Sequence, residues 1–108
     1  MTVEELAKIT GLSTVTLPDG EREINGAYVG DLLSWVMGRA SSDNAWITIM
    51  SNLNVVAVAT LADVGCVIFA EGVTPDEELI TVARTKGINL LASPVSAYET
   101  AIMISKYV

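Results

Sequence analysis

Short apolar runs alternate with polar turns and longer helical patterns through the second half of the chain. The apolar runs predict three strands, at 46–50, 65–70 and 88–92. The segments that follow them predict helices, at 53–62, 74–87 and 93–108. Strands that alternate with helices in this way are typical of a parallel sheet covered by helices. We therefore expect one α/β domain over residues 1–108, with three layers and a mainly parallel sheet that carries helices on both faces.

The first half of the chain predicts shorter elements. Thr2 and Glu5 have the spacing of a capping box, which predicts a short helix that ends at Gly11. The residues after this helix predict a strand, a turn and a short returning strand, at 12–17, 18–20 and 21–24.

A second helix is expected between Gly30 and Gly38, with Gly30 as its N-cap and Gly38 as its end. Its buried face is expected to hold Leu32, Leu33, Val36 and Met37. Asp31 falls in the first turn, where the helix dipole favours a carboxylate. Two roles are open for Gly30 and Asp31: they start this helix, or they contact a ligand.

The two last helices have well-marked starts. Thr74 is expected as an N-cap, with Pro75 at the first helical position and Glu77 completing a capping box. Ser93 and Pro94 are expected to start the last helix in the same way.

The helix at 53–62 is apolar almost all round, so it must be covered on more than one side. The sheet provides one cover, and the second is either another subunit or the rest of this chain. The helix at 93–108 is also apolar over a wide surface. These two helices favour a homodimer.

Composition removes several classes of function. Apolar residues make up 51% of the chain, and the net charge is −7 without a basic cluster, so a nucleic-acid partner is not expected. There is no histidine, which removes the commonest metal ligand and general base, and neither a metal nor another cofactor is expected.

The lone Cys66 is expected as a buried free thiol, which suits the cytoplasm. No signal peptide is expected, and polar residues interrupt the uncharged stretch 44–62, so no membrane span is expected either.

A catalytic apparatus is also missing from the sequence pattern. Neither a Gly-x-x-x-x-Gly-Lys-Ser/Thr nor a Gly-x-Gly-x-x-Gly loop is present, and no base is available to activate a serine. We therefore expect that the chain is not an enzyme.

A binding site is expected where the parallel strands end. Ligands of open parallel sheets bind outside the carboxyl ends of the strands, where helix N-termini present free N–H groups. The loops at that edge supply the candidate ligand-binding residues Ser51, Asn52, Asn54, Glu71, Gly72, Thr74, Ser93 and Ser96. Each of these residue types is also common in caps and turns, so a purely structural role is the competing interpretation.

Several ordered segments of this chain resemble the DRTGG domain family. These are the segments 26–37, 46–49, 54–59, 74–77 and 93–96. The Asp-Arg-Thr-Gly-Gly run that gives the family its name is absent. Many relatives carry a Gly-Asp-Arg-like turn after the strand equivalent to 46–50, where this chain has Ser51-Asn52-Leu53-Asn54.

The resemblance implies a fold like the non-catalytic N-terminal domain of HPr kinase/phosphorylase, in a regulatory and dimer-forming part of a larger system. Together with the residues, it predicts a cytoplasmic regulatory module. Such a module would bind a nucleotide or another small anionic or polar metabolite at the carboxyl edge of the sheet and form a homodimer. The alternative is a module without a small-molecule ligand, which only dimerises or joins a larger metabolic enzyme.

Overall fold

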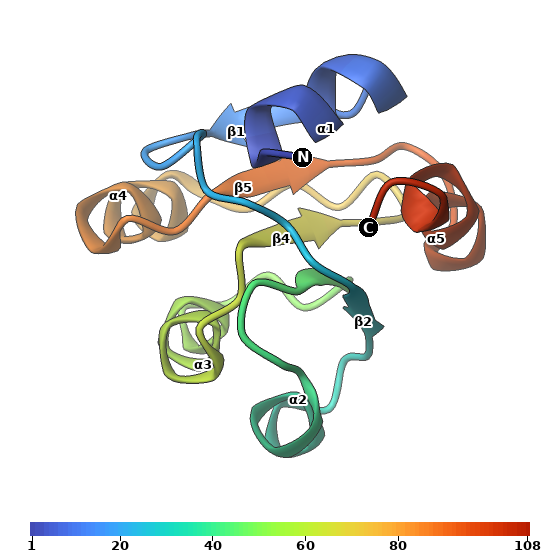
Figure 1. The fold of residues 1–108 in the computed structure, drawn as a ribbon. Coiled ribbons are helices and arrows are strands. Elements are labelled where there is room, and N and C mark those ends of the chain that lie inside the picture. Colours follow the sequence, from blue (N-terminus) through green and yellow to red (C-terminus); the bar gives the residue numbers. More distant parts are fainter.

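The computed structural model describes residues 1–108, which form a five-stranded sheet covered by helices (Figure 1). The strands are β1 (Ser13–Thr16), β2 (Ala27–Val29), β3 (Ala45–Thr48), β4 (Cys66–Phe69) and β5 (Leu90–Ala92). The helices are α1 (Val3–Thr10), α2 (Leu33–Arg39), α3 (Asn54–Ala62), α4 (Glu77–Lys86) and α5 (Ala97–Ser105). The strand order is β1-β5-β4-β3-β2, with β2 to β5 parallel and β1 antiparallel to β5. The expected mainly parallel α/β sheet is confirmed.

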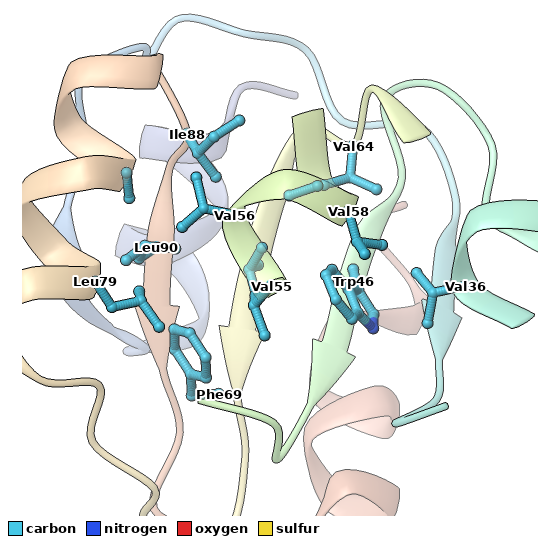
Figure 2. Packing of buried hydrophobic residues seen from close by; sticks show 13 residues of the cluster. Val36, Trp46, Val55, Val56, Val58, Val64, Phe69, Leu79, Ile88 and Leu90 are labelled. Carbon is cyan, nitrogen blue, oxygen red and sulfur yellow. The ribbon is translucent and has the colours of Figure 1, made fainter. Parts of the chain in front are cut away.

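Two buried clusters form the layers on either side of the sheet. Helices α2, α3 and α4 pack on one face, where Val36, Val55 and Leu79 meet the strand residues Trp46 and Phe69 (Figure 2). Helices α1 and α5 pack on the other face, in a cluster that includes Leu6, Ile47, Ile68, Leu91 and Ile104. Consecutive strand residues thus face opposite sides of the sheet, which explains why every residue of β3 and β4 is buried.

The helices that follow the parallel strands do not all cover the same face of the sheet. Helices α2, α3 and α4, which connect β2 through β5, all lie on the same face, whereas α5, which follows β5, lies on the opposite face (Figure 1). The chain therefore diverges after β4 and β5, since one strand leads to α4 and its neighbour leads to α5.

Most predicted elements are confirmed, with small shifts at their ends. The capping box of Thr2 and Glu5 is present, and α1 ends at Gly11 in the left-handed region, with φ of 77°. The strands predicted at 12–17, 46–50, 65–70 and 88–92 correspond to β1, β3, β4 and β5. Cys66 is a buried free thiol, as expected.

The prediction for residues 21–38 was wrong in three respects. No strand forms at 21–24, where Glu23 makes only an isolated bridge with Thr2, and the strand β2 lies at 27–29 instead. Helix α2 begins at Leu33 and ends at Arg39, so Gly38 lies inside it. Of its expected buried face only Val36 is buried, while Leu32 and Met37 are 58% and 49% exposed.

Hydrogen bonds of Gly30 explain why α2 starts late. The N–H of Gly30 donates to the carbonyl of Ile47 at 3.1 Å, and its own carbonyl accepts from Nε1 of Trp46 at 2.8 Å. Gly30 therefore continues the pairing of β2 with β3 and does not cap a helix.

The amino-terminal edge of the sheet is fastened by Arg22. Its Nη2 donates to Oδ1 of Asp43 and to Oδ1 of Asp63, each at 2.9 Å, and to the carbonyl of Asp63 at 2.7 Å. Burial alone would lower the pKa of Arg22, but the hydrogen bonds with Asp63 and Asp43 outweigh burial and raise it. Asp43 and Asp63 precede β3 and β4, so Arg22 links the segments that lead into two core strands.

Both outer strands of the sheet are short or irregular. β2 has three residues, and the register of β1 against β5 shifts between Thr14 and Thr16. No helix of the protein has the length and apolar character needed to cross a membrane.

Candidate functional site

The carboxyl ends of three parallel strands meet at one edge of the sheet. Thr48, the last residue of β3, is paired with Phe69 at the end of β4, and Phe69 is paired with Ala92 at the end of β5. The loops that follow these strands therefore share this edge, as the parallel order of the strands requires.

A crevice of about 210 Å³ lies where the chain diverges, between the loop from β4 to α4 and the loop from β5 to α5. Crevices of this origin are the usual ligand sites of open α/β sheets. It is lined by Ser13, Gly72, Val73, Thr74, Ala92, Ser93 and Pro94. The structure thus brings together three of the predicted residues, Gly72, Thr74 and Ser93.

Ser13 is a lining residue that the sequence interpretation missed. It lies at the start of β1 and is paired with Ala92, because β1 runs antiparallel to β5. The alternating pattern of residues 12–17 indicates a strand but carries no information about its partner or its direction.

Two backbone hydrogen bonds hold the walls of the crevice in place. The N–H of Glu71 donates to the carbonyl of Val95 at 2.7 Å, and the N–H of Gly72 donates to the carbonyl of Ser93 at 3.0 Å. Glu71 and Gly72 have φ of 61° and 71°, in the left-handed region, which is the conformation that glycine adopts without strain. A Cβ at Gly72 would meet no atom within 4 Å, so backbone conformation, and not close packing, accounts for the glycine.

The Ser93 side chain faces the interior and not the crevice opening. Its hydroxyl is buried and hydrogen-bonded to the hydroxyl of Thr100 at 2.7 Å. Ser93 was also predicted to cap the last helix, which was wrong, because Ser96 accepts from the N–H of Glu99 at 3.1 Å and is the N-cap of α5. Ser93 therefore offers a ligand its backbone at most, and Ser96 already serves the helix.

Thr74 is exposed in the crevice wall, and its predicted role as an N-cap was wrong. Oδ1 of Asp76 accepts from the N–H of Leu79 at 2.9 Å, so Asp76 is the N-cap of α4. Pro75 is buried and precedes the cap, whereas it was expected in the first helical position. The Thr74 hydroxyl remains available to a ligand.

The candidates Ser51 and Asn52 lie on the neighbouring loop, after β3, and Asn54 is the first residue of α3; none of the three lines the crevice. Oδ1 of Asn52 accepts from the N–H of Asn54 at 2.9 Å, which shapes the turn into α3.

The remaining candidates, Gly30 and Asp31, follow β2, which is separated from β4 by β3. Oδ1 of Asp31 accepts from the hydroxyl of Thr48 at 2.8 Å and from the N–H of Ile49 at 2.9 Å. Both residues thus make structural contacts with β3 and the segment that follows it.

The surroundings of the crevice are acidic. Glu71 is exposed next to the lining residue Gly72 but is not itself a lining residue, and the N-cap and first turn of α4 add Asp76, Glu77 and Glu78. None of the lining residues is charged. No group of three or more histidine, cysteine, aspartate or glutamate side chains is arranged to hold a metal ion.

Comparison with solved structures finds the same fold in a regulatory protein. The chain is similar to the crystal structure of the CBS and DRTGG domains of the regulatory region of Clostridium perfringens pyrophosphatase, complexed with the activator diadenosine tetraphosphate. The TM-score is 0.74 over 95% of this chain. The fold is DRTGG-like. The sequences are 14% identical and the match spans 45% of the other chain, so the similarity concerns the fold.

No family model matches the sequence, and no curated protein does. The DRTGG-like fold therefore rests on the arrangement of strands and helices and on the structural match.

Proposed function

We propose that this chain is a non-catalytic regulatory module that binds a small polar metabolite in the crevice between the β4–α4 and β5–α5 loops. The observation that supports this most is the divergence of the chain at the ends of β4 and β5, which opens a crevice at the usual ligand position of such sheets. Nucleotides and their parent nucleosides are the first candidates. The DRTGG-like neighbour supports this choice, because its regulatory region was crystallised with a nucleotide activator.

The side chains at the crevice favour binding over catalysis. Ser13 and Thr74 supply hydroxyl groups, but activation of a hydroxyl as a nucleophile needs a base within hydrogen-bond reach, and the chain has no histidine. Asp31 already accepts two structural hydrogen bonds at a strand that does not border the crevice. The free thiol of Cys66, which forms no disulfide, suits the reducing cytoplasm as the place of action.

Thermal unfolding in the presence of nucleosides, nucleotides and other polar metabolites tests this proposal. A ligand at about ten times its Kd stabilises the native state by about 1.4 kcal/mol. For a domain of this size that raises the Tm by roughly 6–11 °C. Backbone amide NMR of the same mixtures should then show shifts at Gly72, Thr74 and Ser93. Binding that shifts only amides elsewhere in the molecule contradicts the proposed site.

A second candidate function is assembly, and the surface of α3 favours it. Leu61 is 73% exposed and lines a mainly apolar groove of about 350 Å³ between α3 and α4. The groove is lined by Leu53, Val56, Ala57, Thr60, Leu61, Val82 and Lys86. A protruding apolar side chain and an apolar groove on the same face are what a two-fold homodimer needs, because each copy supplies both.

Light scattering of the protein during size-exclusion chromatography tests the homodimer. We expect a dimer that Leu61→Asp converts to a monomer, because a carboxylate in an apolar contact loses its hydration. Ile102→Asp, at an exposed apolar position of α5, is the matched control and should leave the dimer intact. A monomeric wild-type protein at high concentration would remove this second candidate.

A further inference from the structure

The basic side chains of the protein all lie outside the crevice. Of the six lysine and arginine residues, none is among the residues that line it. Arg22 is tied to Asp43 and Asp63 at the amino-terminal edge of the sheet. The other five lie at the C-terminal ends of helices: Lys8, Arg39, Arg84, Lys86 and Lys106. A phosphate in the crevice therefore finds no cation there.

The helix N-termini beside the crevice are each capped by a side chain and carry acidic residues in the first turn. The carboxylate of Asp76 accepts the N–H of Leu79, and Glu77 and Glu78 follow in the first turn of α4. At α5, the Ser96 hydroxyl accepts the N–H of Glu99, whose own carboxylate lies beside it. Phosphates bind helix N-termini through free N–H groups and a positive end charge. Here Asp76 and Ser96 each take one N–H group, and a phosphate near the remaining N–H groups would meet the like charge of the acidic side chains.

The size and the polar groups of the crevice suit a small neutral molecule. Its volume of about 210 Å³ is smaller than the roughly 300–1,000 Å³ of sites that enclose larger ligands. The exposed hydroxyls of Ser13 and Thr74 can both donate and accept hydrogen bonds without carrying charge. Glu71, exposed next to the lining residue Gly72, adds a negative charge near the crevice and so favours a ligand without one.

From these observations we infer that the crevice selects a polar ligand without negative charge, and that among nucleotide-type metabolites it binds the uncharged nucleoside in preference to the phosphorylated nucleotide. This inference rests on the proposed function and names the ligand class of the same site. The separation of bases and acids makes the preference electrostatic, so it must depend on salt. Added salt should weaken the discrimination against phosphates, because it screens the repulsion.

The test compares the common nucleosides, each beside its 5′-monophosphate, by amide NMR titration of the full chain. Each pair shares base and ribose and differs only in the phosphate. We expect at least one nucleoside to shift the amides of Gly72, Thr74 and Ser93, with its monophosphate binding about tenfold more weakly at low salt. This ratio should decrease as salt is added.

A triple variant, Asp76→Asn with Glu77→Gln and Glu78→Gln, isolates the charge effect. Asparagine is as good an N-cap as aspartate, so α4 should keep its start. Monophosphate affinity should rise severalfold, while nucleoside affinity stays within about twofold. The control carries the same change in net charge at other sites, as Glu4→Gln, Glu21→Gln and Glu23→Gln, and should leave both affinities unchanged.

The possible outcomes distinguish failure of the charge preference from failure of the proposed function. A monophosphate that binds at these amides as tightly as its nucleoside overturns the inference and leaves the proposed function standing. Absence of binding by every compound of both series overturns the inference and counts against a nucleotide-type ligand altogether. A nucleoside preference that the triple variant does not reduce also overturns the inference, because charge would then not be its cause.

Discussion

The hydroxyl of Thr48 donates a hydrogen bond of 2.8 Å to Oδ1 of Asp31, which ties the segment after β2 to the last residue of β3. The same oxygen accepts the N–H of Ile49 at 2.9 Å. Asp31→Ala should therefore lower the free energy of unfolding by about 1–3 kcal/mol, because it leaves the buried Thr48 hydroxyl and a backbone N–H without their acceptor.

Asp31→Asn is the matched control for this prediction. An amide oxygen can accept both hydrogen bonds, so the loss should be no more than about 1 kcal/mol. Urea unfolding of the three proteins gives the comparison. Equal losses for the alanine and asparagine variants would show that the charge of Asp31, and not its position as an acceptor, stabilises the fold.

The start of α4 gives a second prediction. Asp76→Ala should cost about 1 kcal/mol, since it removes the acceptor for the N–H of Leu79, whereas Thr74→Ala should cost less than about 0.5 kcal/mol. Chemical unfolding measures both. Asp76→Asn should keep most of the stability, because asparagine caps equally well. A larger loss of stability for Thr74→Ala than for Asp76→Ala would show that Thr74 is the N-cap, as the sequence suggests.

The third prediction concerns acid stability. Hydrogen bonds from Ser42 and from Arg22 lower the pKa of Asp63 in the folded protein. The native state then binds fewer protons than the unfolded state, so the stabilisation is present above the unfolded pKa of about 3.9 and is lost as the pH falls through the lower folded value. We expect Asp63→Asn to flatten the decrease in unfolding free energy between about pH 5 and pH 3.

Because Asp63 is largely exposed, the size of this effect should decrease with added salt. Glu78→Gln, at a carboxylate without an ion pair in the structure, is the control and should keep the acid slope of the wild type. An unchanged slope in Asp63→Asn would mean that the contacts of Asp63 with Ser42 and Arg22 do not persist in solution.

The fourth prediction uses the free thiol. Burial raises the pKa of Cys66 to about 12, against a smaller opposing effect of Arg22. Because the thiolate is the reactive form, labelling of native protein near pH 8 should be on the order of a thousandfold slower than labelling of unfolded protein. Its rate should follow global unfolding as denaturant is added. Rapid stoichiometric labelling without denaturant would show that β4 opens locally.

The core of the fold could be predicted because its signals are local and agree with one another. All residues of β3 and β4 except Thr48 are apolar, and each strand is followed by turn residues and a helical pattern, so neither element type nor order was ambiguous. The parallel direction follows from the length of the connections. The meeting of the strand ends at one edge then follows from geometry alone.

The misplaced caps had a different cause. Thr74 and Asp76, like Ser93 and Ser96, are good N-cap residues two or three positions apart, and local sequence does not rank them. Tertiary contacts decide, because Pro75 is buried and the Ser93 hydroxyl is held by Thr100. The strand β2 was missed for a related reason, since three residues are too few to show a period.

The site itself was predicted only in part. The crevice depends on α5 crossing to the face opposite α4, and a helix that is apolar on several sides does not reveal which face it covers. Contacts between residues that are distant in the sequence could not be predicted from local patterns either. Asn89 exchanges hydrogen bonds with the backbone of Asp19 across 70 positions of sequence, at 2.9 Å and 2.8 Å, and no local pattern announces it.

The two outer strands described above bear on how copies of this protein can meet. An open sheet edge invites another strand to add to it, which in an apolar chain leads to ribbon-like polymers. Here one border ends after three residues and the other is broken between Thr14 and Thr16, so neither offers a regular row of unpaired backbone groups. Growth by strand addition is thereby blocked at both ends, and orderly association is left to the helical faces.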